Sequence, residues 1–304
     1  RRLSVNSVKN IEIGNGKTMK MSIAIVHYPH RSICENITFF AENGFDVIEF
    51  YGPDFYDTVK NSESGKVLAE TLQKNKVTAA VHHMIPKPDN KEACERFYDE
   101  MKAMKKWQKE YGLLEILSFD VWIVDRTKVT QMMQYAIDTF AGTGTKIAFE
   151  DFPLNTYELI KSGLNYTDES GILMDFGHTN ARLCATGPNP QNCFLENKGE
   201  GAPLIPGDNS VEAFRMAFIK KPLPVYELHL HNNNGKADEH DFIEHGTADF
   251  RGIAKMLKEV GFKGIATLEM GPALHGKTGV AADKATIESL NNWKTWVKEA
   301  EQSR

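Results

Sequence analysis

Apolar residues recur along this chain in two alternating patterns: short continuous runs, and longer stretches with apolar positions three or four residues apart. The short runs are typical of buried β-strands, and the longer stretches are typical of helices with one buried face. The short runs predict strands at residues 21–26, 46–50, 77–83, 113–119, 146–150, 171–175, 225–231 and 264–269. The longer stretches predict helices at residues 33–43, 64–74, 90–111, 127–140, 157–162, 211–220, 250–260 and 282–299.

The first predicted helix has clear signals at both ends. Ser32 can accept a hydrogen bond from a backbone amide of the first turn, and it precedes apolar Ile33, Ile37 and Phe40 at helical spacing. Gly44 follows at the position where helices commonly stop. The chain therefore passes from strand to helix and back within a short span, as α/β folds do.

Eight strands that alternate with eight helices most simply predict a single (β/α)8 barrel, which we place at residues 19–304. The alternative is a doubly wound open sheet, but no G-x-G-x-x-G motif follows the first strand. Residues 1–18 are mostly polar and form an N-terminal extension. Its Asn15-Gly16 pair predicts a hairpin turn.

The composition disfavours nucleic acid and membranes as binding partners of this protein. The net charge is −5, from 41 acidic and 36 basic residues, whereas nucleic-acid-binding proteins usually present a basic face. No apolar run approaches the ~18–20 residues that span a membrane. The four cysteines lie far apart, although Cys184 and Cys193 flank a Pro/Gly loop and could pair in an oxidising compartment. We expect a cytoplasmic location; because the chain begins with Arg1 rather than Met, this expectation leaves export open.

Carboxylates and imidazoles stand at the ends of four consecutive predicted strands. In a barrel these ends converge over one mouth, so the side chains should meet there. This group comprises Glu150, Asp175, His178, His229, His231, Asp238, His240 and Glu269. Such ligands suit Mn²⁺, Mg²⁺, Co²⁺ or Zn²⁺. We expect His27 and His30, after the first strand, at the rim.

Two glutamates across a bound metal can act as a paired acid and base once their environments separate their pKa values. Glu150 and Glu269 are the candidates for these catalytic roles. The plainer alternative is that both form salt bridges at the rim of the barrel. The concentration of ligand side chains at neighbouring strand ends favours the catalytic interpretation.

Several segments, taken in order, resemble the xylose isomerase-like (AP endonuclease family 2) barrels. The resemblance covers roughly residues 19–269. The matching segments are 44–49 (GFDVIE), 147–153 (IAFEDFP), 174–178 (MDFGH), 229–240 (HLHNN through DEH), 246–250 (GTADF) and 264–269 (GIATLE).

The resemblance implies a divalent metal held by four residues. They are Glu150, Asp175, His229 and Glu269. His229 is preferred to His231 because the family histidine lies three residues before a polar Asp or Asn, which is Asn232 in this chain.

The resemblance also implies a second set of contacts. In endonuclease IV-like members a further metal is held at positions that match His178, Asp238 and His240, so these residues could bind a second metal or substrate. The nuclease pattern also requires a histidine at the end of the fourth strand. This chain has Ser118-Phe119 there, which disfavours the nuclease interpretation.

The family implies an isomerase or epimerase acting on a sugar or sugar phosphate. An endonuclease IV-like phosphodiesterase is the alternative, and a polyol dehydratase would use the same ligands. His82 (in preference to His83), His231 and Arg182 are the predicted substrate contacts. The connection at residues 185–209 is long enough to serve as a lid or subunit contact. Family members commonly form homo-oligomers.

Overall fold

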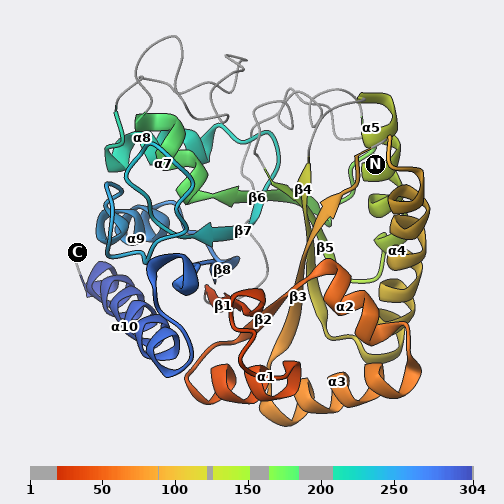
Figure 1. The fold of residues 1–304 in the computed structure, drawn as a ribbon. Coiled ribbons are helices and arrows are strands. Elements are labelled where there is room, and N and C mark those ends of the chain that lie inside the picture. Colours follow the sequence, from red (N-terminus) through yellow and green to blue (C-terminus); the bar gives the residue numbers. More distant parts are fainter. Residues whose placement is uncertain (1–18, 88, 122–125, 151–163, 185–207, 303–304) are drawn as a thin grey trace.

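The computed structural model describes residues 19–87, 89–121, 126–150, 164–184 and 208–302. Within these residues eight parallel strands close into a barrel in the order β1 to β8, and β8 pairs with β1 (Figure 1). The predicted (β/α)8 barrel is confirmed, and the open sheet is excluded. The predicted hairpin at 11–16, the helix at 157–162, nearly all of the 185–209 connection and the cysteine at 193 lie outside the described residues.

The elements of the described residues alternate in the order expected of a (β/α)8 barrel. The strands are β1 Lys20–Ala24, β2 Val47–Tyr51, β3 Thr78–Ile85, β4 Leu114–Val121, β5 Lys146–Glu150, β6 Ser170–Asp175, β7 Val225–Leu230 and β8 Ile265–Leu268. The α-helices are α1 Ile33–Glu42, α2 Gly52–Val59, α3 Ser62–Asn75, α4 Lys91–Tyr111, α5 Arg126–Phe140, α7 Phe176–Cys184, α8 Val211–Ile219, α9 Phe250–Glu259 and α10 Val280–Gln302. Two 3₁₀ turns are η1 Ile25–His27 and η3 Pro272–His275.

Three differences from the predicted elements matter for the mouth of the barrel. The first strand ends at Ala24 and continues as η1, so His27 lies in a turn rather than after an extended strand. Helices α2 and α7 follow β2 and β6 directly and were not predicted. Both missed helices therefore begin at the carboxyl ends of the strands.

The ends of α1 agree with the sequence. The Ser32 side chain accepts from the amide of Glu35, and the Glu35 carboxylate accepts from the amide of Ser32, which is a capping box. Gly44 has a φ of 92°, a left-handed conformation that glycine adopts without steric cost. These signals set the direction in which the chain enters β2.

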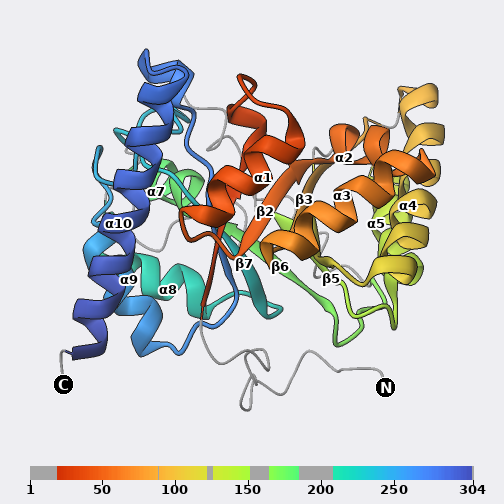
Figure 2. The same cartoon turned by 90° about the horizontal axis from the view of Figure 1, so that it is seen from below.

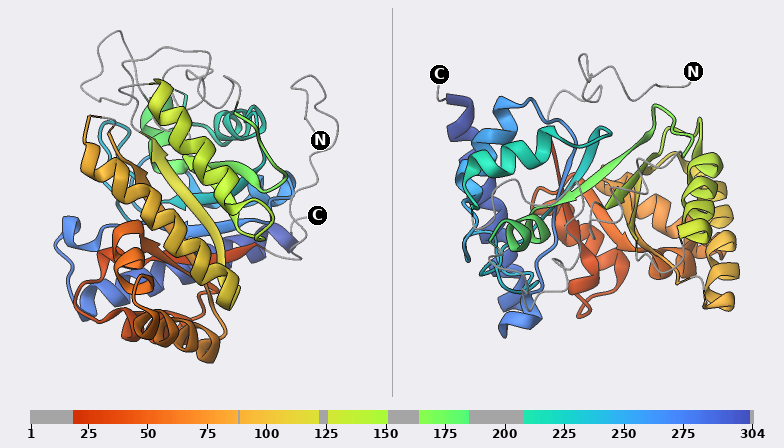
Figure 3. Two further views of the ribbon diagram at one scale, coloured as in Figure 1. Left: turned by 90° about the vertical axis from the view of Figure 1, so that its right-hand side faces the viewer. Right: turned by 90° about the horizontal axis from the view of Figure 1, so that it is seen from above.

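The helices form the outer layer of the molecule (Figures 2 and 3). Helix α1 packs beside α3, α4 beside α5, and α9 beside α10. Among the described helices, none combines the length and the apolar character needed to cross a membrane.

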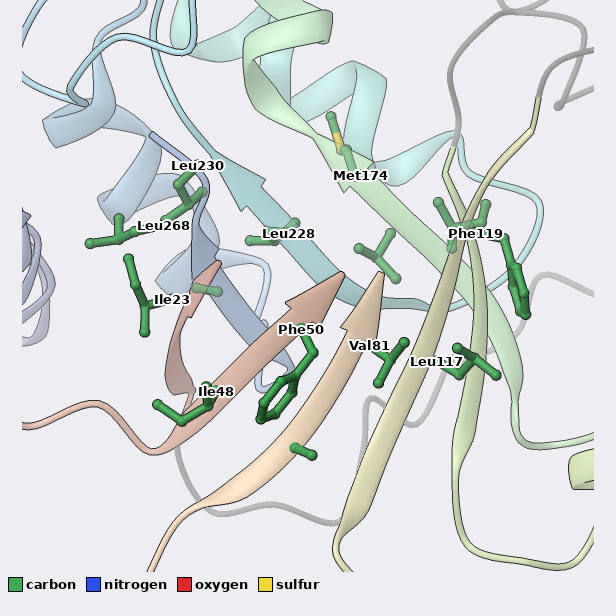
Figure 4. Close-up of a cluster of buried hydrophobic side chains, with 14 of the residues drawn as sticks. Ile23, Ile48, Phe50, Val81, Leu117, Phe119, Met174, Leu228, Leu230 and Leu268 are labelled. Atoms are coloured by element: carbon green, nitrogen blue, oxygen red, sulfur yellow. The ribbon is translucent and has the colours of Figure 1, made fainter. Parts of the chain in front are cut away.

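Strand side chains separate into two apolar sets because successive residues point to opposite faces. Outward positions such as Ile48, Phe50 and Leu228 join helix residues in one large buried cluster (Figure 4). A small separate cluster fills the inside of the barrel, and it consists of Val47, Ala80, Ile116, Ala148, Leu173 and Ile265. This inner apolar layer is the floor on which the polar residues of the mouth rest.

Candidate metal centre and active site

The strand side chains that point into the barrel are apolar in the floor and polar near the carboxyl ends of the strands. Glu150 ends β5, Asp175 ends β6, His229 lies in β7, and Glu269 follows β8. The register of β6 and β7 places Asp175 directly beside His229. All but Glu269 are almost completely buried, and the side chain of Glu269 is only 14% exposed.

The four residues predicted as metal ligands form one connected group. Nδ1 of His229 lies 2.9 Å from Oε2 of Glu269 and 3.8 Å from Oδ2 of Asp175. Glu150 joins them through His178, whose Nδ1 lies 2.7 Å from Oε1 of Glu150 and 3.7 Å from Oδ2 of Asp175. In strand order, Glu150 and Glu269 therefore flank the Asp175–His229 pair.

A carboxylate behind His229 fixes the orientation of its ring. Nε2 of His229 lies 3.1 Å from Oε2 of Glu49. Because a carboxylate accepts hydrogen bonds, Nε2 donates to Glu49, while Nδ1 faces a second carboxylate, that of Glu269. Burial lowers the pKa of His229, but the charges of Glu269 and Glu49 outweigh it and raise the pKa well above its usual value. A cation bound beside Nδ1 would replace the proton on that nitrogen. Histidines that bind metals commonly have such a partner on their second nitrogen.

Glu227 belongs to the same buried layer and was missed in the sequence. Thr267 donates from its hydroxyl to Oε1 of Glu227, at 3.1 Å. Burial, followed by the charge of Glu49, raises the pKa of Glu227 well above its usual value, which favours its protonated form. Its place two residues before His229, on the same face of the strand, could have revealed it.

A second group of ligand side chains adjoins the first. His178, His231, Asp238 and His240 each offer one atom within 4.8 Å of the others. Oδ2 of Asp238 lies 3.3 Å from Nε2 of His178 and 3.1 Å from Nε2 of His240. The sequence predicted three of these residues together and placed His231 among the substrate contacts. The structure adds His231 to this group and buries it completely.

The two histidines of β3 point in opposite directions. Nε2 of His82 lies 3.7 Å from Oε2 of Glu150, and Nδ1 lies 3.2 Å from the hydroxyl of Ser118. His83 instead forms a 2.7 Å contact with Glu100 of α4 on the outside of the barrel. Strand β4 runs from Leu114 to Val121 and contains no histidine, so its end lacks the imidazole that the nuclease pattern requires.

The remaining predicted contacts lie around the rim. Arg182 is part of α7, but its side chain is outside the described atoms. His27 comes near His240, with ring centroids 6.1 Å apart, and it also groups with Glu269. His30 is directed away from the site and lies 3.3 Å from Asp283 of α10.

The buried charges shift one another's pKa values. Burial raises the pKa of Glu150 to about 8 even though His178 opposes this shift. Burial also acts against ionisation of Asp175, but the charges of His178 and His231 outweigh it and lower its pKa to about 2. Burial lowers the pKa of His240, and the bond to Asp238 overcomes it, raising the value to about 9. A metal ion would replace the protons on such ligands.

The first group fits a divalent cation. Oε1 of Glu150 is buried and has no hydrogen bond of acceptable geometry among the described residues, although Nδ1 of His178 is near it. Since an imidazole with poor hydrogen-bond geometry is the contact that this buried oxygen makes among the described residues, a cation beside it would compensate its charge better. Three carboxylates and one imidazole, from Glu150, Asp175, Glu269 and His229, form a donor set that suits Mn²⁺, Mg²⁺, Co²⁺ or Zn²⁺.

The family is clear from residues 37–296, which match the model of the xylose isomerase-like TIM barrels. The chain belongs to this family. None of the curated proteins matches the chain.

Solved structures of sugar epimerases share the fold. A D-tagatose 3-epimerase-like protein is 19% identical, with a TM-score of 0.65 over 92% of this chain and 99% of that chain. The D-psicose 3-epimerase of Clostridium cellulolyticum H10, solved with D-tagatose, is 14% identical, with a TM-score of 0.63 over 92% and 99%. A probable 3-DHS dehydratase from Bacillus anthracis is 15% identical, with a TM-score of 0.57 over 90% and 99%. At these identities the similarity concerns the fold.

Proposed function

We propose that this protein is a divalent-metal-dependent epimerase or isomerase of a sugar or sugar phosphate, and that 3-epimerisation of a ketose is its preferred reaction. The observation that carries the proposal is the placement of Glu150 and Glu269 on either side of the Asp175–His229 pair. The epimerases among the structures of similar fold support the choice of reaction.

The cation would be held by Glu150, Asp175, His229 and Glu269. When bound, it supplies Lewis-acid polarisation of the substrate carbonyl, which makes the neighbouring C–H bond more acidic. Glu49 holds His229 in the orientation that the site needs.

The two glutamates would exchange a proton with the sugar. One carboxylate removes the proton from the carbon next to the carbonyl, and the pair of electrons from the C–H bond passes into an enediolate of the substrate. The other glutamate, in its acid form, returns a proton to the opposite face of the same carbon. Glu150 and Glu269 exchange roles when the reaction runs in reverse. His82, beside Glu150, and Arg182 are proposed contacts to substrate hydroxyls.

The phosphodiesterase alternative is less well supported, because β4 contains no histidine to serve as the ligand that the nuclease pattern requires. A dehydratase would use the same ligands, and one structure of similar fold is a probable dehydratase. The two reactions differ in the fate of the substrate, so they can be separated experimentally.

The test is incubation of the Mn²⁺-loaded protein with D-tagatose and D-fructose in D₂O, followed by NMR. Deuterium at C3 together with inversion there supports the proposal. Exchange at C1 with formation of an aldose indicates an isomerase, and loss of water from a polyol substrate indicates a dehydratase. Glu150→Gln and Glu269→Gln should each lower the rate by about 10²–10⁴, whereas Glu269→Ala with full activity would sink the paired-glutamate mechanism.

A further inference from the structure

The imidazole of His82 and the hydroxyl of Ser118 meet where β3 and β4 run side by side. The register pairs the two residues, and Nδ1 of His82 lies 3.2 Å from Oγ of Ser118. Ser118 is completely buried, whereas the side chain of His82 is 16% exposed. The serine is therefore a fixed partner for a ring that reaches the mouth of the barrel.

The surroundings of Ser118 decide which of the two partners donates. A serine hydroxyl has one proton to donate and two lone pairs that accept. Oγ of Ser118 donates to the backbone carbonyl of Val81 at 3.4 Å, and the carboxyl group of Glu227 is a second acceptor near the same hydroxyl. Because its proton is directed to these acceptors, the hydroxyl accepts from His82. Nδ1 of His82 therefore carries the ring proton.

The other nitrogen of His82 is an acceptor. A histidine with an ordinary pKa of about 6.5 is already neutral at pH 8, and burial lowers the pKa of His82 further, to about 4. A neutral imidazole carries a single N–H proton, so Nε2 keeps a lone pair when Nδ1 donates. The bond to Ser118 thus decides what the ring offers on its opposite edge.

Nε2 of His82 faces the proposed catalytic group. It lies 3.7 Å from Oε2 of Glu150, which is too long for a direct hydrogen bond. Since this nitrogen has no proton to donate to the carboxylate, a group that donates a proton fits beside it. A sugar hydroxyl at the mouth supplies such a proton.

The proposed reaction indicates which hydroxyl this is. C3 of the ketose loses its proton to a glutamate, and the oxygens of C2 and C3 become part of the enediolate. C4 therefore carries the nearest hydroxyl that stays intact throughout the reaction. D-tagatose and D-fructose differ in configuration at C4 alone, so a contact at this carbon also affects the choice between the two sugars.

We propose that Ser118 is a positioning residue: it holds the Nδ1–H tautomer of His82, so that Nε2 accepts a hydrogen bond from the C4 hydroxyl of the ketose. The identity of this hydroxyl rests on the proposed 3-epimerisation, whereas the tautomer of His82 does not. Ser118 acts through His82 and does not touch the substrate. A buried serine on β4 thereby contributes to substrate specificity.

The tautomer is tested on protein labelled with ¹⁵N-histidine, loaded with diamagnetic Mg²⁺ and held at about pH 8, where histidines of ordinary pKa are neutral. Long-range ¹H–¹⁵N spectra distinguish a protonated ring nitrogen from an unprotonated one, and His82→Gln identifies the signals of His82. The native chain should show a protonated Nδ1 and an unprotonated Nε2. Ser118→Ala should populate the Nε2–H tautomer, and Ser118→Thr, which keeps the hydroxyl, should restore the native pattern.

Specificity is tested with D-tagatose and its 4-deoxy analogue in the D₂O assay. Loss of one hydrogen bond should lower kcat/KM of Ser118→Ala with D-tagatose by about 10-fold. The same variant should lose less than about 2-fold with the 4-deoxy sugar, because the bond is already missing there. Ser289→Ala removes another fully buried hydroxyl, on α10, and this matched control should change neither the spectrum of His82 nor the ratio of the two rates.

Three results would overturn the proposal: a protonated Nε2 of His82 in the native chain, a native tautomer in Ser118→Ala, or equal losses of this variant with the two sugars. Failure of the proposed function is a different result, namely no exchange at C3 with either D-tagatose or D-fructose. The spectra need no turnover, so they decide the role of Ser118 in that case as well.

Discussion

At the scale of single residues, the sequence predicted which strand-end side chains lie together, and it missed the buried residues beneath them. Asp175 stands out because it ends a recognisable apolar run, and His229 stands out because it alternates with Leu228 and Leu230 in another. Glu227 was missed, although its position two residues before His229 places it on the same face of β7. Its burial follows from closure of the barrel around it, and so it depends on residues distant in the sequence.

Glu49 offers a prediction about metal affinity. Its bond to Nε2 of His229 orients that ring, and loss of such a partner typically costs about 10–100-fold in affinity. We therefore expect Glu49→Ala to lower the affinity for the divalent cation at the site formed by Glu150, Asp175, His229 and Glu269. The affinity is measured by calorimetric titration, and the expected loss is the same about 10–100-fold. Glu42→Gln on α1 is the matched control. Equal affinity in Glu49→Ala and the native chain would contradict the orienting role.

His240 offers a prediction about pH. Its pKa is about 9 in the folded chain, compared with about 6.5 in an unfolded one. A raised pKa stabilises the fold fully below about pH 6.5, and the stabilisation is lost as the pH rises through about 9. Chelator-treated protein should therefore become less stable between pH 7 and 10, by up to about 3 kcal/mol.

The measurement is the thermal unfolding midpoint at several pH values, with His240→Asn for comparison. The variant should show a shallower decline over the same pH range. Identical pH profiles for the two chains would show that His240 contributes nothing.

At the scale of elements, the apolar pattern predicted the long amphipathic helices correctly, but it did not predict the short helices α2 and α7 at the mouth of the barrel. Helix α2 carries a proline in its first turn, a signal that sequence inspection could have used. Helix α7 begins Phe-Gly-His and lacks a local apolar stripe at its start. The amide of His178 donates to Oδ1 of Asp175, so the site itself helps to start this helix.

Gly177 in α7 offers a prediction about packing. An alanine there would collide with the ring of His231, and overpacking of this kind usually costs about 1–3 kcal/mol. Gly177→Ala should lower the free energy of unfolding in urea by this amount. In a His231→Ala background the same change should cost much less, because the obstructing ring is gone. Equal costs in the two backgrounds would rule out the collision as the cause.

At the scale of the whole molecule, strand count and alternation were enough to predict a closed barrel. The sequence did not reveal which contacts join the first and the last β/α unit of the barrel. Arg31, in the turn after η1, pairs with the buried Asp283 of α10, and Tyr28 bonds to Thr286 of the same helix at 2.5 Å. These contacts span nearly the full length of the chain, so local patterns carry no trace of them.

Asp283 therefore offers a prediction about global stability. Removing one partner of a largely buried ion pair leaves the other charge uncompensated. Asp283→Ala should reduce the free energy of unfolding by about 2–4 kcal/mol, as measured in urea. Asp138→Ala, on the exposed face of α5, should change stability by less than about 0.5 kcal/mol. Similar losses in both variants would argue against a specific closing role for Asp283.

The two layers inside the barrel have a consequence for protein engineering. Val47, Ala80 and their neighbours fill the floor with apolar side chains, while the residues proposed to carry the chemistry lie above them. Asp175 and His240 also make contacts that support α7 and the loop after β7, so substitutions that spare these two residues should disturb the fold least. Libraries that keep them and vary the other positions at the mouth should therefore yield folded proteins more often than libraries in the floor, which makes this barrel a suitable starting point for the directed evolution of new substrate preferences.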